Sequence, residues 1–144
     1  MVWTFLVECI TGRYFEKDCK IVIEIDSNAS LLDLHYAIQD AVGFEQDHLF
    51  VFFAGRNARD REILFGVDLE DGDPLVALSD TTLAKVYPLP KGLSLFYRFD
   101  FGDNWNFKVR KIRKNPTEPV EGVDYPRVVG RVGPNPIQYP RCKQ

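Results

Sequence analysis

The stretch Leu93–Lys114, LSLFYRFDFGDNWNFKVRKIRK, decides how this chain folds. Apolar side chains occupy its odd-numbered positions on either side of residues 102–104, an alternation typical of two strands that each turn one face to a core. A three-residue loop over 102–104 keeps odd positions opposite odd positions and gives Asn104 the left-handed conformation that such loops need. The predicted cross-strand pairs are Phe101 with Trp105, Phe99 with Phe107, and Tyr97 with Val109. We therefore expect an antiparallel hairpin with its aromatic side chains inside the core.

A helix is predicted earlier in the chain, over residues 31–42. Ser30 and Asp33 have the spacing of a capping box, in which each side chain bonds the backbone of the other residue. Apolar residues then recur at helical spacing. Gly43 follows and can end the helix in the left-handed conformation.

Strands are expected on both sides of that helix. Apolar residues alternate over Trp3–Cys9 and again over Cys19–Ile25, which indicates a second antiparallel hairpin. The nearly all-apolar run His48–Phe53 indicates a strand buried on both faces. Hairpin, helix and buried strand follow one another in the order of a β-grasp (ubiquitin-like) unit, where the helix crosses a mixed sheet. The predicted fold class is therefore α+β, a β-grasp extended by a second helix and the aromatic hairpin.

The remaining strands and helices are predicted from shorter and weaker sequence patterns. A short strand is expected over Glu62–Phe65, and a short helix over Thr81–Val86, with Ser79 or Asp80 as its cap. The acidic run 68–73 is expected to be a solvated turn. Six of the nine prolines lie after residue 115, so this tail is expected to add an edge strand within Tyr125–Val132 and otherwise to wrap the surface or be disordered.

Length and composition limit the class of protein. At 144 residues, with 45% of them hydrophobic, the chain can form one domain and bury a core without disulfides. We predict a single domain, 1–144, with a β-grasp-like part at about 1–87, the aromatic hairpin at 93–114 and the Pro/Gly-rich tail at 115–144. No run approaches the roughly 20 apolar residues that cross a bilayer, and Met1–Ile10 lacks the basic start of a signal peptide. A cytoplasmic location is expected.

The formal net charge of −3 conceals an uneven distribution. Residues 1–80 carry 16 acidic and 6 basic side chains, whereas residues 81–144 carry 5 acidic and 12 basic ones. Five cations fall within seven residues and are the candidates for binding an anion or a partner: Lys108, Arg110, Lys111, Arg113 and Lys114. Basic residues beside aromatic ones resemble a nucleic-acid platform, but the hairpin register buries the aromatic rings. Alternatively, these five cations lie at a solvated strand end or dock against the acidic half of the chain.

Four polar residues are the candidates for catalysis: Asp100, Asp103, His35 and His48. The two aspartates bracket the hairpin tip, where they could hold a divalent cation or act as an acid/base pair. Alternatively, Asp103 bonds the turn and Asp100 pairs with Arg98 or Lys108. The histidines could titrate near neutral pH or ligate a metal, or they could bond a loop backbone. No third ligand accompanies them, so no metal and no cofactor are predicted.

The string Tyr97–Trp105 resembles the Tyr-x-Tyr-Asp-Phe-Gly-Asp-x-Trp signature of the Ri-plasmid ORF-three-like family. Shorter matches fall in the helix (Leu34-His35) and before the signature (Leu78-Ser79-Asp80), so the resemblance spans roughly residues 3–133. It implies a plasmid-encoded or insertion-element passenger protein and no particular activity. Two departures are Phe99 for the second tyrosine and Phe107 for a histidine that often follows the tryptophan. The acidic end of the family is reduced here to Pro134-Asn135-Pro136.

The absence of a recognisable catalytic motif favours a non-catalytic binding or adaptor module, whose partner would be a protein or an anionic ligand. Two alternatives remain. One is a small metal- or acid/base-dependent enzyme using Asp100, Asp103 and His48. The other is a nucleic-acid-binding protein associated with mobile elements. No membrane partner is expected, and the sequence does not define an oligomeric state.

Overall fold

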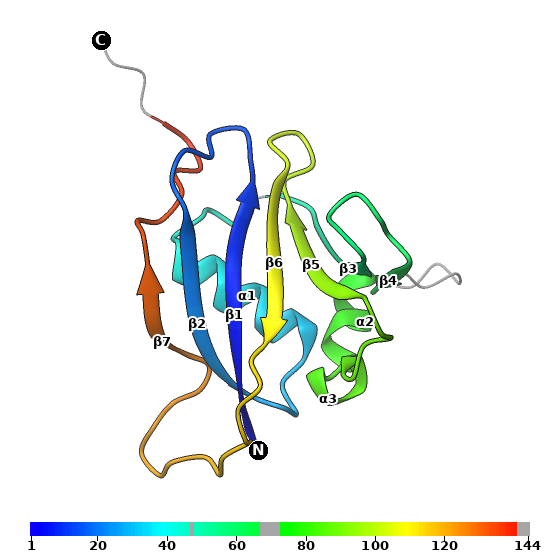
Figure 1. Ribbon diagram of the computed structural model, residues 1–144, viewed down its shortest axis with the longest axis vertical. Helices are drawn as coiled ribbons and strands as arrows, with labels where there is room; N and C mark the ends of the chain where they lie inside the picture. The colour runs from blue at the N-terminus through cyan, green and yellow to red at the C-terminus, as the bar shows by residue number, and fades with distance from the viewer. Residues whose placement is uncertain (47, 67–72, 141–144) are drawn as a thin grey trace.

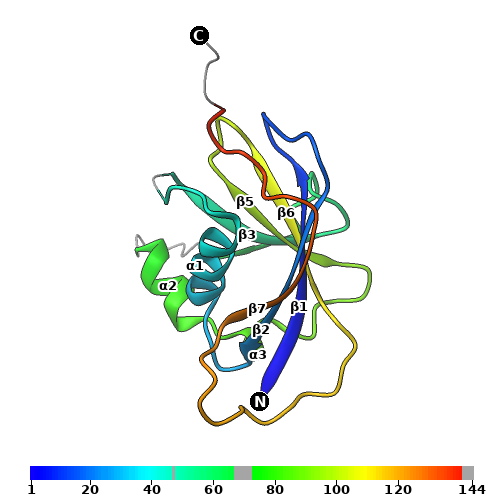
Figure 2. The same cartoon turned by 90° about the vertical axis from the view of Figure 1, so that its left-hand side faces the viewer.

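The computed structural model describes residues 1–46, 48–66 and 73–140. It contains one seven-stranded sheet in the order β4-β3-β5-β6-β1-β2-β7, in which neighbouring strands are antiparallel (Figure 1). The strands are β1 (Val2–Thr11), β2 (Cys19–Asp26), β3 (Phe50–Gly55), β4 (Ile63–Phe65), β5 (Ser94–Phe99), β6 (Trp105–Lys111) and β7 (Arg127–Val132). The helices are α1 (Leu31–Val42), α2 (Pro74–Asp80) and α3 (Leu83–Val86). Figure 2 shows α1 and α2 on the same face of the sheet.

The N-terminal hairpin and α1 confirm their predictions. Strands β1 and β2 pair antiparallel, and their odd-numbered residues from Phe5 and Cys19 onward face the core. The Ser30 hydroxyl accepts from the Asp33 amide at 3.1 Å, and the Asp33 carboxylate accepts from the Ser30 amide at 2.9 Å, so the capping box is complete. Gly43 ends the helix with a φ of 71°.

The aromatic hairpin forms, but its register differs from the prediction. The pairs are Phe99 with Trp105, Tyr97 with Phe107, and Leu95 with Val109, so the loop has five residues, 100–104, instead of three. Odd positions still face odd positions, and Tyr97, Phe99, Trp105 and Phe107 are buried as predicted. Phe101 falls in the loop and is 44% exposed, so its assignment to the core was wrong. Asn104 is left-handed as predicted, with a φ of 56°, and Asp100 is left-handed as well, with a φ of 58°.

The prediction of a mixed sheet was wrong, because the six strand pairings among the described residues are all antiparallel. The β5–β6 hairpin occupies the place beside β1, and β3 pairs with β5 at the outer side of that hairpin. The α+β class holds, and the specific β-grasp assignment is not confirmed.

The shorter elements match their predictions unevenly. β4 lies within the predicted Glu62–Phe65, and β7 is an edge strand within the predicted Tyr125–Val132. The caps of the short helix were wrong: Ser79 and Asp80 belong to α2, and α3 starts after Thr82. Helix α2 itself was not predicted. In the acidic run, residues 68–72 lie outside the described residues, and Asp73 caps α2 by accepting from the Leu75 amide.

The core lies between the sheet and α1. It contains the inward-facing residues of β1, β2, β5 and β6 together with the apolar face of the helix. The opposite sheet face has its own aromatic contact, in which Phe53 and Phe96 stack with 5.5 Å between ring centroids and Arg61 covers the Phe53 ring. Within the described ranges, no helix has the length and apolarity that a membrane crossing requires.

A substitution at Gly12 tests how closely the chain packs against the Trp105 ring of the aromatic hairpin. A Cβ atom on Gly12 would lie 2.1 Å from Cε3 of the buried Trp105 ring, closer than any real contact. We expect Gly12→Ala to lower the free energy of unfolding by about 2 kcal/mol, because an overpacked core must shift its backbone or rings. Urea denaturation measures the change.

Gly102→Ala is the matched control, because its Cβ would only meet Asp100 Oδ1 at 3.4 Å. It should change stability by less than about 0.5 kcal/mol. Equal losses in the two variants would contradict the packing described for Trp105.

Candidate functional site

Asp100 builds the turn that joins β5 to β6. Its Oδ1 atom accepts hydrogen bonds from the amides of Gly102 at 3.1 Å and Asp103 at 3.2 Å. Its backbone carbonyl accepts from the Asn104 amide at 2.6 Å. These bonds hold both left-handed residues in place.

The second carboxylate oxygen of Asp100 contacts His48. Nε2 of His48 lies 3.3 Å from Asp100 Oδ2 and 2.5 Å from the Tyr139 hydroxyl, so the tail reaches this pair. The side chain of Asp100 is 9% exposed and that of His48 is 36% exposed. Both contacts occupy the same ring nitrogen of His48.

His35 belongs to a buried polar cluster under the sheet. Its Nδ1 lies 2.5 Å from the Tyr97 hydroxyl oxygen, and that oxygen accepts from Gln39 Nε2 at 3.0 Å. The ring stacks on Phe50 with 3.6 Å between centroids and 5° between planes. Burial lowers the pKa of His35 to about 4, so the ring is neutral at pH 7. The bonds are satisfied when the Tyr97 hydroxyl donates to Nδ1, which assigns the ring proton to Nε2.

The four candidate catalytic residues converge only in part. His35 and His48 border one cavity of about 480 Å³, and Asp100 contacts His48. Asp103 points elsewhere and pairs with Arg13 at 3.5 Å. Neither Arg98 nor Lys108, the expected partners of Asp100, forms an ion pair with it in the described part of the chain. No group of three His, Cys, Asp or Glu residues suited to a metal ion occurs among the described residues.

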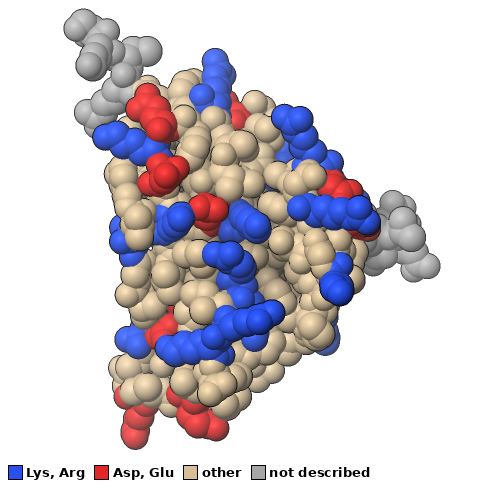
Figure 3. All heavy atoms as spheres, in the orientation of Figure 1, with Lys and Arg blue, Asp and Glu red and all other residues tan. Residues whose placement is uncertain are grey.

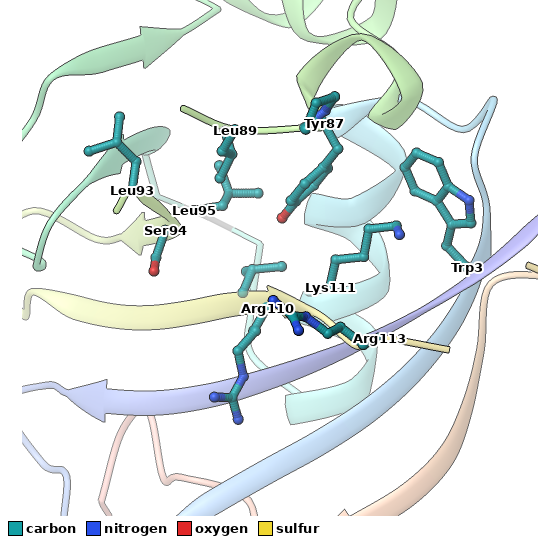
Figure 4. A pocket seen from close by; sticks show the side chains of 11 residues that line it. Trp3, Tyr87, Leu89, Leu93, Ser94, Leu95, Arg110, Lys111 and Arg113 are labelled. Carbon is teal, nitrogen blue, oxygen red and sulfur yellow. The ribbon is translucent and has the colours of Figure 1, made fainter. Parts of the chain in front are cut away.

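A second cavity, of about 600 Å³, lies where β6 ends, and we call it the basic pocket. It is lined by Trp3, Tyr87, Pro88, Leu89, Leu93, Ser94, Leu95, Val109, Arg110, Lys111 and Arg113. Figure 4 shows Tyr87 and Leu89 on one side of this space and Arg110 and Arg113 on the other, with Lys111 between them. The Lys111 ammonium lies 4.7 Å from the Trp3 ring centroid, within cation–π distance.

The five predicted cations divide among three environments. Arg110, Lys111 and Arg113 border the basic pocket. Lys114 lies 4.0 Å from Glu24, and Lys108 is on the sheet face opposite α1, in register with Glu8 of β1. In Figure 3, Lys and Arg side chains extend over this sheet face from its middle into its lower part, and others lie along its upper and right-hand edges.

Two pocket residues, Trp3 and Tyr87, were missed as site residues by sequence reasoning. Trp3 was assigned to the alternation of the first strand, and Tyr87 stands alone after a short helix. Their rings meet edge to face at 6.2 Å. The Tyr87 hydroxyl oxygen is buried and has no hydrogen-bond partner among the described residues. No spacing pattern in the sequence links these two positions, which are 84 residues apart.

This α+β protein belongs to the Plasmid pRiA4b ORF-3-like protein family, whose model matches residues 16–138. The resemblance drawn from the Tyr97–Trp105 signature is thereby confirmed. The chain is 29% identical over 108 residues to the uncharacterized protein y4hQ of Sinorhizobium fredii (strain NBRC 101917 / NGR234), covering 74% of this chain. That alignment covers 53% of y4hQ, so the chain spans about half the length of this relative.

A solved structure shares the fold. The crystal structure of the protein of unknown function MM3350 from Methanosarcina mazei Go1 matches with a TM-score of 0.67 and 30% sequence identity. The match covers 90% of this chain and 68% of that one.

The turn chemistry of Asp100 gives one prediction. Asp100→Ala should lower the free energy of unfolding by about 2 kcal/mol. It removes the carboxylate oxygen that accepts from the Gly102 and Asp103 amides, and it puts alanine in a left-handed conformation. Asp100→Asn keeps an acceptor oxygen and tolerates that conformation, so its loss should stay below about 1 kcal/mol. Urea denaturation compares the two, and equal losses would show that the charge facing His48 matters more than the turn.

The pKa of His35 gives a second prediction. Its folded pKa of about 4 is below the ordinary 6.5, so protonation favours the unfolded chain. The contribution of neutral His35 to the free energy of unfolding is complete above pH 6.5. It is lost as the pH falls toward 4, and the free energy of unfolding then changes by at most about 1.4 kcal/mol per pH unit. In His35→Phe, the slope between pH 6.5 and 5 should decrease, as measured by urea midpoints. An unchanged slope would show that His35 is not the titrating group.

Proposed function

We propose that this chain is a non-catalytic binding protein and that the basic pocket binds the anionic group of its ligand. The observation that carries the proposal is the excess of positive charge there. Arg110, Lys111 and Arg113 border one cavity, and no ion pair joins them to a carboxylate in the described part of the chain. Three uncompensated cations beside apolar walls attract an anion more strongly than the same cations in open water.

The polar contacts of the catalytic candidates support a binding role over a reaction. Asp100 Oδ1 is bonded within its own turn, Asp103 pairs with Arg13, and His35 bonds Tyr97. Each of these contacts stabilises the fold. Three of the four candidates therefore have a structural role that explains their presence. Such groups would have to break a fold-stabilising bond before they could transfer a proton.

Nucleic-acid binding through stacked bases has less support. Tyr97, Phe99, Trp105 and Phe107 are at most 1% exposed and face α1 instead of solvent. Cations on the outer sheet face could still contact phosphates. A salt titration with a single-stranded oligonucleotide tests this alternative, and absence of binding at low salt would reject it.

Calorimetric titration with inorganic phosphate at low salt tests the proposal. We expect saturable binding to one site. Replacing Arg110 and Arg113 together by glutamine should weaken it at least tenfold, because bidentate bonds and two charges are lost.

The matched control replaces Arg56 and Arg59 together by glutamine, which removes two positive charges from exposed side chains outside the pocket. It should leave phosphate affinity within twofold. Absence of phosphate binding, or equal weakening by the control and the pocket variant, would reject the basic pocket as an anion site.

A second candidate function rests on His48 and Asp100, which lie 3.3 Å apart beside the 480 Å³ cavity. A histidine–carboxylate pair next to a cavity can act as an acid/base pair or ligate a cation. If it ligates, divalent cations should raise the melting temperature, and Asp100→Asn should abolish the increase. A melting temperature that does not respond to Mg²⁺, Mn²⁺ or Zn²⁺ would remove the metal-dependent form of this candidate.

A further inference from the structure

We infer that the ligand of the basic pocket is a phosphate monoester that carries an apolar group. This inference rests on the proposed function and names the class of ligand. Both halves of such a molecule have a counterpart in the pocket, one built from cations and the other from apolar side chains.

The apolar half lies opposite the cations. Leu89, Leu93 and Leu95 line the cavity together with Pro88 and Val109. Of these, Leu95 and Val109 are buried, while Leu89 and Leu93 are half-buried and remain accessible from the cavity. A volume of about 600 Å³ is typical of sites for small organic molecules and exceeds what a bare inorganic anion occupies.

The charge of the pocket suits a phosphate ester. A carboxylate carries one negative charge, whereas a phosphate monoester carries nearly two at pH 7. The two arginines can each form paired hydrogen bonds with phosphate oxygens, and Lys111 adds a third positive charge. Trp3 fixes the position of the lysine ammonium through the cation–π contact, so this charge is held at the pocket before a ligand arrives.

Tyr87 supplies an unused hydrogen-bonding group. Its hydroxyl oxygen is buried without a partner, and Figure 4 shows the ring directed from α3 toward the side where Arg110 and Lys111 lie. Burial raises the pKa of Tyr87, so the hydroxyl keeps its proton, and a rotation of the ring toward the cavity would let it donate to a phosphate oxygen. A buried hydroxyl without a partner destabilises the unliganded protein, and a ligand oxygen would remove this cost.

Calorimetric titrations with three ligands test the inference: inorganic phosphate, hexyl phosphate and phenyl phosphate. At least one ester should bind ten or more times as tightly as phosphate. A preference for hexyl phosphate indicates a chain in the apolar half, and a preference for phenyl phosphate indicates a ring. If phosphate binds and neither ester binds more tightly, the inference is overturned while the anion site stands. If none of the three binds, both fail.

Tyr87→Phe separates ligand binding from a structural role. Because it deletes only an unpartnered oxygen, the unliganded variant should melt at the wild-type temperature or slightly above it. Its affinity for the tighter ester should fall three- to tenfold. Unchanged affinity would contradict the assigned donor.

Leu93→Asn tests the apolar half independently. It should bring the affinity of the ester down to that of inorganic phosphate, with both affinities measured on the variant. An unaltered ratio of the two affinities would overturn the assignment of the apolar wall.

Discussion

The Asp100 turn determines which residues of β5 and β6 lie opposite one another. Its carboxylate holds two backbone amides, and left-handed conformations at both ends of the loop return the chain in the register that sets Phe99 opposite Trp105. In this register Tyr97 lies opposite Phe107, and its hydroxyl meets His35 and Gln39 on the side of α1. The register also brings the basic end of β6 beside the start of β5, where the pocket forms. Fold and candidate site thus share one local cause.

Local patterns in the sequence were sufficient for the elements whose stabilising groups are near one another. The capping box of α1, its terminating glycine and the N-terminal hairpin each depend on residues within a few positions. The loop length was not predictable in this way, because a three-residue and a five-residue loop both place odd positions opposite odd ones. Only the carboxylate of Asp100, bonding forward to Gly102 and Asp103, selects the longer one. Helix α2 was missed because Leu78 is its sole buried residue, so it has no apolar periodicity.

The candidate sites also divide into residues that are close in the sequence, which were predictable, and residues from distant segments, which were not. The cations of the basic pocket were predictable because they are adjacent in sequence, and the register then settles which of them face the cavity. Trp3 and Tyr87 come from distant segments and meet only in the folded chain. The catalytic candidates were individually visible, yet their contacts reveal turn, ion-pair and core roles that residue type alone does not indicate. Uncompensated positive charge beside apolar walls is therefore the more informative feature of this molecule.

Mapping of backbone amide shifts by NMR during titration with hexyl phosphate tests the central claim most directly, because every amide reports on its own position. The account predicts that the largest shifts occur at Val109–Arg113 and Tyr87–Leu95, with smaller ones at the tip of the Asp100 turn. Shifts centred on His48, Leu49 and Phe101 would contradict it and would place the ligand in the cavity bordered by the two histidines.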